Sequence, residues 1–403
     1  PFAGQKDLIN SLDFRLQGDL YFPRFADYFK LWRGLKGLGF TSEKFYETMR
    51  QKATSRFSSS YNLLELLGNY RLQFVNVTYG FDIPVNLNKR LSINHFGVDF
   101  IVPDIEPNSR FDSVLQQQPF LQNSFKTQFI TGFLFRDLTY VFTGSTSPSG
   151  GSWFFRGNFD LSGLEVWAAN ASYNAVSGQS PDFKLFKVDF SHYAKLELDG
   201  RRYWQFSPNR LLAARLDAGI ARPYYHSESV PYVKQFFVGG PNSIRGWYAR
   251  ALGPGLYKDP LNDIPGSRNL FYQAADFKIE FNLEYRFLLM RPLNLFNLYG
   301  AVFLDGGNIW TLEPDSNRIG SQLAFRREMK DNVIVQDNFL REFGIGTGFG
   351  SRWDFTYFVF RLDLGLPLRN NYPDPERGNK YWRDVSELRL KDVVLNLGLG
   401  YPF

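Results

Sequence analysis

Polar and apolar residues alternate with a period of two along much of the chain. From Asp276 to Phe287, large apolar side chains occupy every second position, and the positions between them are polar or charged. Similar alternation runs through the segments 12–22, 185–199 and 357–366. This period predicts β-strands that have one polar face and one apolar face.

The character of the two faces favours a membrane setting. The polar face carries full charges and the apolar face carries bulky side chains, whereas a water-soluble sandwich would pack its apolar face on a second sheet. The segments are about as long as the 9 to 11 residues that a tilted strand needs to cross the hydrocarbon layer. We therefore expect an all-β fold, a transmembrane antiparallel β-barrel of the bacterial outer membrane.

The connections between these segments support a barrel. Counted back from Phe403, long joins at 367–391, 311–340 and 223–270 alternate with short joins at 351–353 and 291–295. Long extracellular loops that alternate with short periplasmic turns are typical of outer-membrane barrels. Strands are expected to begin near residues 8, 53, 68, 90, 125, 153, 183, 210, 271, 297, 341, 354 and 392.

This count predicts the domain organisation. Bacterial single-chain barrels have an even number of strands, so about 13 strands here suggest 16 in the full protein, with three before residue 1. Residues 1–403 are expected to form one barrel domain, and residues 223–270 are expected to form an extracellular loop. The stretch 25–51 is expected on the periplasmic side, in short amphipathic helices at the membrane surface. Their apolar residues would be Tyr28, Trp32, Phe40, Phe45 and Tyr46.

Amino-acid composition narrows the class of protein further. Aromatic residues make up 18% of the chain, which suits strands and interfacial girdles, and no run approaches the roughly 18 to 20 apolar residues of a spanning helix. The absence of Cys removes disulfides and thiolate metal sites. The net charge of +6 is spread along the chain, so we expect no nucleic-acid partner. Since Pro1 is not an initiator Met, we expect the chain to be part of a longer protein.

Two motifs stand out in the C-terminal half. Residues 237–247 read Phe-Val-Gly-Gly-Pro-Asn-Ser-Ile-Arg-Gly-Trp, and Leu-Gly-Pro-Gly follows at 252–255. Residues 301–310 read Ala-Val-Phe-Leu-Asp-Gly-Gly-Asn-Ile-Trp, where alternation places Phe303, Asp305 and Gly307 on one face. An inward acid among small residues is a natural counter-ion for a cation inside a barrel.

These motifs resemble the conserved segments of the BamA, TamA and two-partner-secretion transporter family. The loop motif of that family reads Arg-Gly followed by an aromatic residue, here Arg245, Gly246 and Trp247, with Trp where Phe or Tyr is usual. Its second motif corresponds to Phe303, Asp305, Gly307 and Trp310. The resemblance is closest to TamA-like proteins, particularly the lipoprotein branch called TamL.

The resemblance implies a loop that folds into the barrel. Arg245 would pair with Asp305, and Glu284 on the neighbouring strand would be a second acceptor. Gly344, Gly346, Gly348 and Gly350, on one face of one strand, would leave room for the loop. The alternative is that these glycines merely permit curvature of the barrel.

The C-terminus is similar to the signal by which barrel proteins are themselves recognised. Its residues are Asn396, Gly398, Gly400, Tyr401 and Phe403. Pro402 cannot donate a ladder hydrogen bond and is expected outside the paired part of the last strand.

The resemblance implies a factor that inserts or exports client proteins through a lateral seam between the first and last strands. Its partners would be outer-membrane lipid, client outer-membrane proteins and an inner-membrane or periplasmic protein, the last reached through N-terminal POTRA domains outside this chain. The alternative is a passive porin or a pore for solutes or secreted proteins. We expect no cofactor, no metal and no enzymatic activity, since His95, His192 and His226 lie in separate segments and resemble surface or girdle residues.

Overall fold

The chain forms two compact units. The computed structural model describes residues 11–145, 150–179, 184–258, 273–292, 295–330, 333–355, 357–374, 378–384, 386, 388–389 and 392–403. The first unit comprises Pro1–Phe142, Arg156–Leu196 and Ala221–Lys234, and the second comprises Thr143–Phe155, Glu197–Ile220 and Gln235–Phe403.

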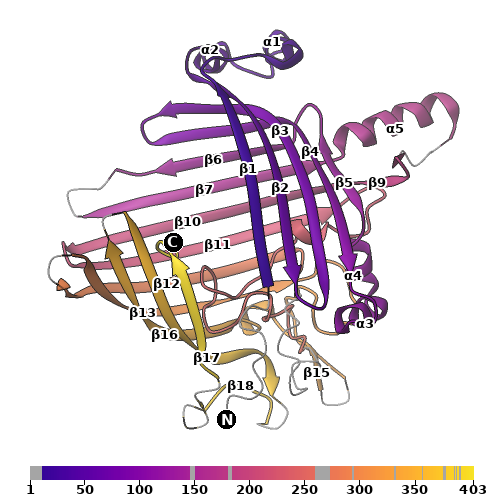
Figure 1. Cartoon of the computed structure of the whole chain (residues 1–403). Helices are drawn as coiled ribbons and strands as arrows, with labels where there is room; N and C mark the ends of the chain where they lie inside the picture. Colours follow the sequence, from indigo (N-terminus) through magenta and orange to yellow (C-terminus); the bar gives the residue numbers. More distant parts are fainter. Residues whose placement is uncertain are drawn as a thin grey trace. The chain divides into compact units, whose positions relative to one another are not determined.

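The first unit is built on consecutive antiparallel strands (Figure 1). Strand β1 (Ser11–Phe22) pairs with β2 (Thr54–Leu66), β2 pairs with β3 (Tyr70–Asn86), and β3 pairs with β4 (Lys89–Ile105). One end of β4 pairs with β6 (Asp137–Thr143), and the other part pairs with the short β5 (Gln128–Gly132). The other elements that lie wholly or mostly in this unit are η1 (Tyr28–Lys30), α1 (Leu31–Gly37), α2 (Glu43–Lys52), α3 (Arg110–Gln117), α4 (Pro119–Ser124), β7 (Gly151–Ser162), α5 (Leu164–Ser177), β8 (Lys184–Leu185), β9 (Val188–Ser191) and η2 (Tyr232–Lys234).

The second unit is a run of antiparallel neighbours in the order β11, β12, β13, β16, β17 and β19. Their bounds are Arg210–Pro223, Phe277–Met290, Asn297–Trp310, Gly344–Phe355, Phe358–Asp374 and Val394–Leu399. The remaining elements are β10 (Tyr193–Ser207), the hairpin of β14 (Glu328–Lys330) and β15 (Val333–Gln336), η5 (Phe339–Arg341) and β18 (Lys380–Trp382). Strands β7, β10 and β11 have residues in both units.

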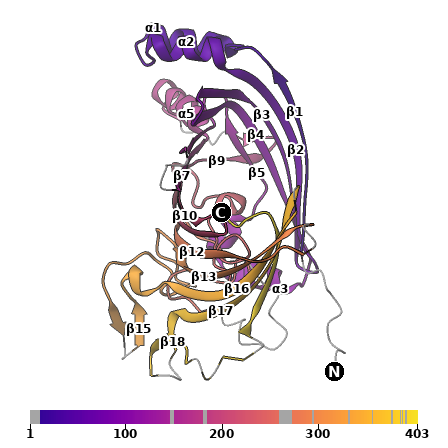
Figure 2. The same cartoon turned by 90° about the vertical axis from the view of Figure 1, so that its left-hand side faces the viewer.

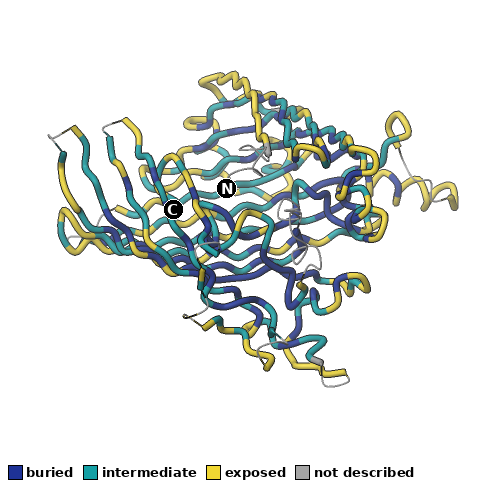
Figure 3. Tube along the Cα trace, turned by 60° about the horizontal axis from the view of Figure 1, so that its bottom comes forward, coloured by how far each residue is buried: buried dark blue, intermediate teal, exposed yellow. Residues whose placement is uncertain are grey.

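The polar face of β12 is the buried one. Glu284 is 0% exposed, whereas its apolar neighbour Leu283 is 39% exposed, and the same alternation runs along most of the strand. In Figure 3 many exposed residues lie at turns and strand ends, and the residues of β1 after Ser11 are exposed as well. A water-soluble sheet would bury the opposite face, so this inversion suits a sheet whose apolar side meets lipid.

The all-β antiparallel prediction is confirmed, and most strands begin within a few residues of their predicted positions. Near residue 125, however, only the five-residue β5 follows, and a separate strand, β6, begins at Asp137. The predicted turn at 351–353 is wrong, because β16 continues to Phe355 and β17 begins at Phe358. The cross-strand partners of β16 on β17 extend the pairing past the predicted turn.

The segment 185–199 is not one strand. Phe186 and Lys187 have positive φ angles, and the chain turns there between β8 and β9 before β10 begins at Tyr193. Apolar and polar residues still alternate through such a turn, so the period alone could not reveal it. Residues 8–10, where the first strand was expected to begin, and residues 259–272 of the long loop lie outside the described residues.

Two of the three histidines are buried, which corrects their assignment to surface or girdle positions. His95 and His192 are each 2% exposed. His95 Nε2 accepts a hydrogen bond from Trp32 Nε1 at 2.6 Å, and its Nδ1 lies 2.6 Å from the carbonyl oxygen of Leu134. His95 therefore joins α1 to the strands as a structural residue.

Short helices occupy the stretch 25–51 between β1 and β2. In Figure 2, α1 and α2 lie beyond the ends of β1 and β2. Ser42 caps α2 by accepting a hydrogen bond from the N–H of Phe45, and acidic Glu43 occupies the first turn. No helix within the described ranges is long and apolar enough to cross a membrane.

Candidate functional site: a buried arginine on the polar face of the sheet

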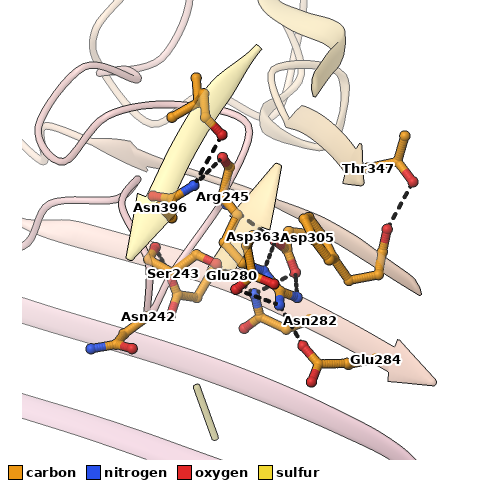
Figure 4. Close-up of polar contacts among 12 residues, drawn as sticks. Asn242, Ser243, Arg245, Glu280, Asn282, Glu284, Asp305, Thr347, Asp363 and Asn396 are labelled. Atoms are coloured by element: carbon orange, nitrogen blue, oxygen red, sulfur yellow. Dashed lines mark hydrogen bonds and ion pairs between the residues drawn. The ribbon is translucent and has the colours of Figure 1, made fainter. Parts of the chain in front are cut away.

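The loop between β11 and β12 brings Arg245 onto the polar face of the second unit (Figure 4). Its guanidinium donates to Asp305 of β13 through Nε and Nη2, at 2.8 and 2.9 Å, and its Nη1 donates to Glu284 of β12. The backbone N–H of Arg245 also donates to Asp305, at 3.1 Å. All three side chains are 0% exposed. A planar guanidinium can satisfy two carboxylates at once, which the point charge of a lysine cannot do.

The register of β12 and β13 assembles the acceptor for this arginine. Asn282 lies opposite Asp305, and Glu284 lies opposite Phe303. Asn282 Nδ2 donates to Asp305 at 3.0 Å, and the ring centroid of Phe303 lies 3.5 Å from Arg245 Cζ, in a cation–π contact. Two cross-strand pairs thus supply both acids, an amide and an aromatic platform.

Further charged residues surround the pair, and sequence reasoning did not include them in the site. Asp363 of β17 lies 3.7 Å from Arg245 Nη1. Arg352 of β16 donates to Glu284 at 2.8 Å and to Asp363 at 2.5 Å, and Arg286 donates to Glu284 at 2.7 Å. Arg352 and Asp363 belong to the alternating polar face of their strands, which was the available signal. The contacts of Arg352 with Glu284 and Asp363 depend on three strand registers that no local motif specifies.

Glycines let the loop backbone approach the strands closely. A Cβ atom on Gly365 of β17 would lie 2.1 Å from the carbonyl oxygen of Arg245. A Cβ on Gly346 would lie 3.2 Å from the Cα atom of Gly246, the loop residue after the arginine. Gly344 faces the Leu252 side chain in the same way, at 2.8 Å. These contacts favour the space-making role of the glycines where the loop touches the sheet.

The other two glycines on this face of β16, Gly348 and Gly350, have different neighbours. A Cβ on Gly348 would lie 2.0 Å from the carbonyl oxygen of Leu364, and one on Gly350 would lie 2.0 Å from Asp363 Oδ1. Neither glycine has a loop atom among its nearest neighbours. Their small size serves strand packing and the acid cluster instead.

The tryptophans of the two motifs lie in different surroundings. Trp247 is partly buried, and its ring would be 3.3 Å from a Cβ on Gly344. Trp310 is fully buried, and its Nε1 donates to Glu342 Oε2 at 2.5 Å. A Cβ on Gly307 would lie 2.3 Å from the carbonyl oxygen of Ile279, so the small residue there permits close strand approach.

Glu342 gives this region a pH dependence. Burial raises the pKa of Glu342 to about 8, despite the stabilising hydrogen bond from Trp310. Because the folded pKa lies above the unfolded value of 4.5, its stabilising contribution is complete below pH 4.5 and is lost as pH rises through about 8. We expect Glu342→Gln to reduce the loss of thermal stability measured between pH 6 and pH 9. Equal losses in the two proteins would contradict an ionising Glu342.

The C-terminal segment contacts the loop motif. Asn396 of β19 donates through Nδ2 to the carbonyl oxygen of Arg245 at 3.0 Å. Arg361 donates to Asn242 of the loop at 2.8 Å, and a Cβ on Gly398 would lie 2.5 Å from Arg361 Nη2. The loop is therefore hydrogen-bonded to the last strand as well as to the acids.

The final residues lie beyond β19. Gly400 has a φ of +80°, in the left-handed region that favours glycine, and the following residues are outside the strand. Arg286 donates to the backbone oxygen of Phe403 at 3.2 Å, and the ring centroid of Tyr401 lies 4.4 Å from Arg286 Cζ. Pro402 is thus outside the described strand pairing, as its missing N–H requires.

A second buried charge cluster fastens the beginning of the loop in the first unit. Lys234, in η2, donates to Asp160 of β7 at 3.2 Å and lies 3.6 Å from Asp99 of β4. Arg136 binds the same two acids, and the hydroxyl of Tyr193 donates to Asp160 at 3.1 Å. The loop therefore has a basic side chain of its own bound to buried acids in each unit, Lys234 in the first and Arg245 in the second.

We expect Lys234→Met to lower the free energy of unfolding by about 1–3 kcal/mol, because two buried carboxylates lose a donor while Arg136 remains. Lys126→Met is the matched control, since Lys126 pairs with Asp189 at the surface and an exposed pair contributes about 0–1 kcal/mol. Denaturant unfolding in detergent would measure both. Equal effects of the two substitutions would show that Lys234 is not an anchor.

The charged residues of the described segments do not form a metal site. No group of three or more His, Cys, Asp or Glu residues in those segments is arranged to hold a metal ion. The acids around Arg245 are instead neutralised by arginines, which suits a structural lock rather than acid–base catalysis.

The family follows from a comparison with known proteins. Residues 35–403 match the Omp85 superfamily domain. The chain belongs to the Omp85 superfamily. It is therefore a bacterial outer-membrane β-barrel protein, and members of this superfamily mediate outer-membrane protein assembly or secretion without being enzymes.

Two solved structures are similar to this chain. A BamA from Haemophilus ducreyi lacking POTRA domains 1–3 has a TM-score of 0.51 and 12% identity, and the match covers 88% of this chain and 59% of the BamA chain. CdiB from Escherichia coli has a TM-score of 0.43 and 12% identity, covering 79% of this chain and 47% of CdiB. At such identities the likeness to BamA shows the fold alone. This chain spans about three fifths of the length of that BamA.

Proposed function

We propose that this protein inserts or exports client outer-membrane proteins through a lateral seam next to its last strand. Membership of the Omp85 superfamily supports the general role. The short length of β19 supports a seam at this strand. It has 6 residues, whereas its partner β17 has 17. Gly398 in this strand, and Gly400 and Pro402 after it, weaken pairing further.

The observation that carries the proposal is the hydrogen bond from Asn396 of β19 to the Arg245 carbonyl oxygen. The residue that holds the loop against the acids is thereby joined to the strand at the seam. A loop that leaves its acid cluster would withdraw this support from β19. Loop position and seam stability are therefore coupled in the proposed mechanism.

An open seam would act through its backbone. The unpaired edge of a strand presents N–H and C=O groups that can pair with an incoming strand by β-augmentation. Affinity would then depend little on client sequence, which suits a factor that handles many clients. No covalent bond is made or broken in this mechanism.

The loop motif around Arg245 favours the TamA-like branch, in particular TamL, within the superfamily. Its partners would be client outer-membrane proteins and the surrounding lipid. An inner-membrane or periplasmic protein would be reached through N-terminal POTRA domains, as the resemblance implies.

Depletion followed by complementation tests the function. Depletion should lower the levels of other barrel proteins or surface lipoproteins, and the intact gene should restore them. Arg245→Ala should fail to restore them, whereas Arg326→Ala, at an exposed loop position, should succeed. A defect in the uptake of one solute, with normal levels of barrel proteins, would instead identify a passive pore and contradict the proposal.

A further inference from the structure

The helical segment 24–52 between β1 and β2 combines exposed apolar side chains with positive charge. It contains seven Lys and Arg residues against three Asp and Glu residues, a net charge of +4 in a chain whose total is +6. Six of the seven basic side chains are exposed, and the seventh, Lys36, pairs with Glu43. This segment therefore carries a local excess of positive charge at its surface.

The inner side of this segment is firmly packed on the strands. Trp32 and Met49 are buried in one core with Phe81, Ile83 and Ile93 of β3 and β4. The hydrogen bond from Trp32 to His95 fixes α1 to β4. The segment is thus a built part of the fold and holds its outer surface in a defined position.

The helices cover the apolar face of the second half of β3. Asn76 and Thr78 line a polar cavity of about 440 Å³ in the first unit, whereas Tyr79, Phe81 and Ile83 pack with the helices. Alternation along a strand puts these two sets on opposite faces. In an outer-membrane barrel, the apolar face of a strand contacts lipid, and the helices lie on this face of β3. They also lie next to the first residues of β2, since α2 ends at Lys52 and β2 begins at Thr54.

The outer side of the segment carries exposed apolar residues that are not part of that core. Leu38 and Phe40, in the turn between α1 and α2, are 74% and 77% exposed, and Phe29 is 84% exposed. Large apolar side chains beside clustered cations are typical of segments that lie in a membrane interface. Anionic headgroups would complement the charge, and the boundary of the acyl chains would take up Leu38 and Phe40.

We propose that residues 24–52 bind the anionic phospholipid surface beside the barrel and insert the turn around Leu38 and Phe40 into it. The bound segment fixes the height and tilt of the first unit's strands in the membrane. This role goes beyond the proposed assembly function and does not depend on it.

The absence of Cys allows a direct test on the whole protein. Phe40→Cys, labelled with a polarity-sensitive fluorophore, is reconstituted in phosphatidylcholine vesicles with or without phosphatidylglycerol and with a phospholipid that carries a nitroxide near the headgroup. Asn88→Cys, in the turn between β3 and β4, is the control. We expect a blue shift and nitroxide quenching at position 40, stronger with phosphatidylglycerol, and weak quenching at position 88.

Charge reversal tests the electrostatic part. Lys30→Glu, Arg33→Glu and Lys44→Glu together should reduce quenching at position 40. In the protein without these changes, salt raised from about 0.1 to 1 M should do the same, as the Debye length falls from about 10 to 3 Å. The inference is overturned if position 40 is quenched no more than position 88. It is also overturned if position 40 shows a blue shift without quenching, which would mean that protein covers it, or if phosphatidylglycerol has no effect.

Discussion

Arg245→Ala is expected to destabilise the second unit by about 3–5 kcal/mol, because it leaves Asp305 and Glu284 buried without their shared cation. Arg286 and Arg352 still contact Glu284, so Asp305 bears most of the loss. The backbone donor to Asp305 would be lost too if the loop moved away. Denaturant unfolding in detergent, followed by the gel-mobility difference between folded and unfolded barrels, measures the change.

Two companion variants separate charge from geometry. Arg245→Lys keeps the positive charge, but the lysine ammonium cannot donate to both acids as the planar guanidinium does. This variant should therefore recover only part of the stability that Arg245→Ala loses. Arg245→Asp combined with Asp305→Arg should restore some of the loss caused by either single change. Recovery should be incomplete, because the new acid at position 245 would face Glu284 and Asp363. Strict additivity of the two single changes would mean that the residues do not interact.

Gly365→Ala is expected to displace the loop even though it leaves every charged group in place. The new Cβ would overlap the Arg245 carbonyl oxygen, at 2.1 Å, and neither backbone can yield as a flexible side chain would. Ordinary overpacking costs about 1–3 kcal/mol, and expulsion of the loop would raise the loss toward that of Arg245→Ala. Limited proteolysis of the loop and the unfolding free energy should both report the change.

Gly18→Ala is the control for this substitution. Gly18 lies within β1, and a Cβ there would have nothing within 4 Å. Its unfolding free energy and loop proteolysis should remain close to those of the parent protein. Adding Arg245→Ala to Gly365→Ala should give much less than the sum of the two losses, since both release the same contact. A fully additive pair would show that Gly365 does not act through the loop.

The strand pattern could be predicted because it depends on local sequence, whereas the pairing of Arg245 with Asp305 and Glu284 was implied only by the family resemblance. Alternation along β12 places Glu284 and Asn282 on one face whatever the rest of the protein does. The same holds for Phe303 and Asp305 on β13. Two neighbouring strands then need only their register to assemble the arginine's acceptor.

The remaining features depend on contacts that local sequence does not encode. Asp363 and Arg352 complete the cluster through the registers of β16 and β17, and the Lys234 anchor needs acids from two separate strands. The break between β5 and β6 coincides with Arg136, whose side chain is drawn into the first unit's acid cluster. The close approach of Gly365 to the loop is likewise visible only in three dimensions.

The most direct test of the account asks whether the loop rests against the acids in the native membrane. Ser243→Cys and Asn282→Cys place thiols at neighbouring positions, since Asn282 Nδ2 donates to the Ser243 carbonyl oxygen at 2.8 Å. A short bifunctional thiol reagent applied to intact outer membranes should join them in high yield when Arg245 is present and in low yield with Arg245→Ala. Absence of the cross-link in the parent background, or an equal yield in both, would contradict a loop held in place by that arginine.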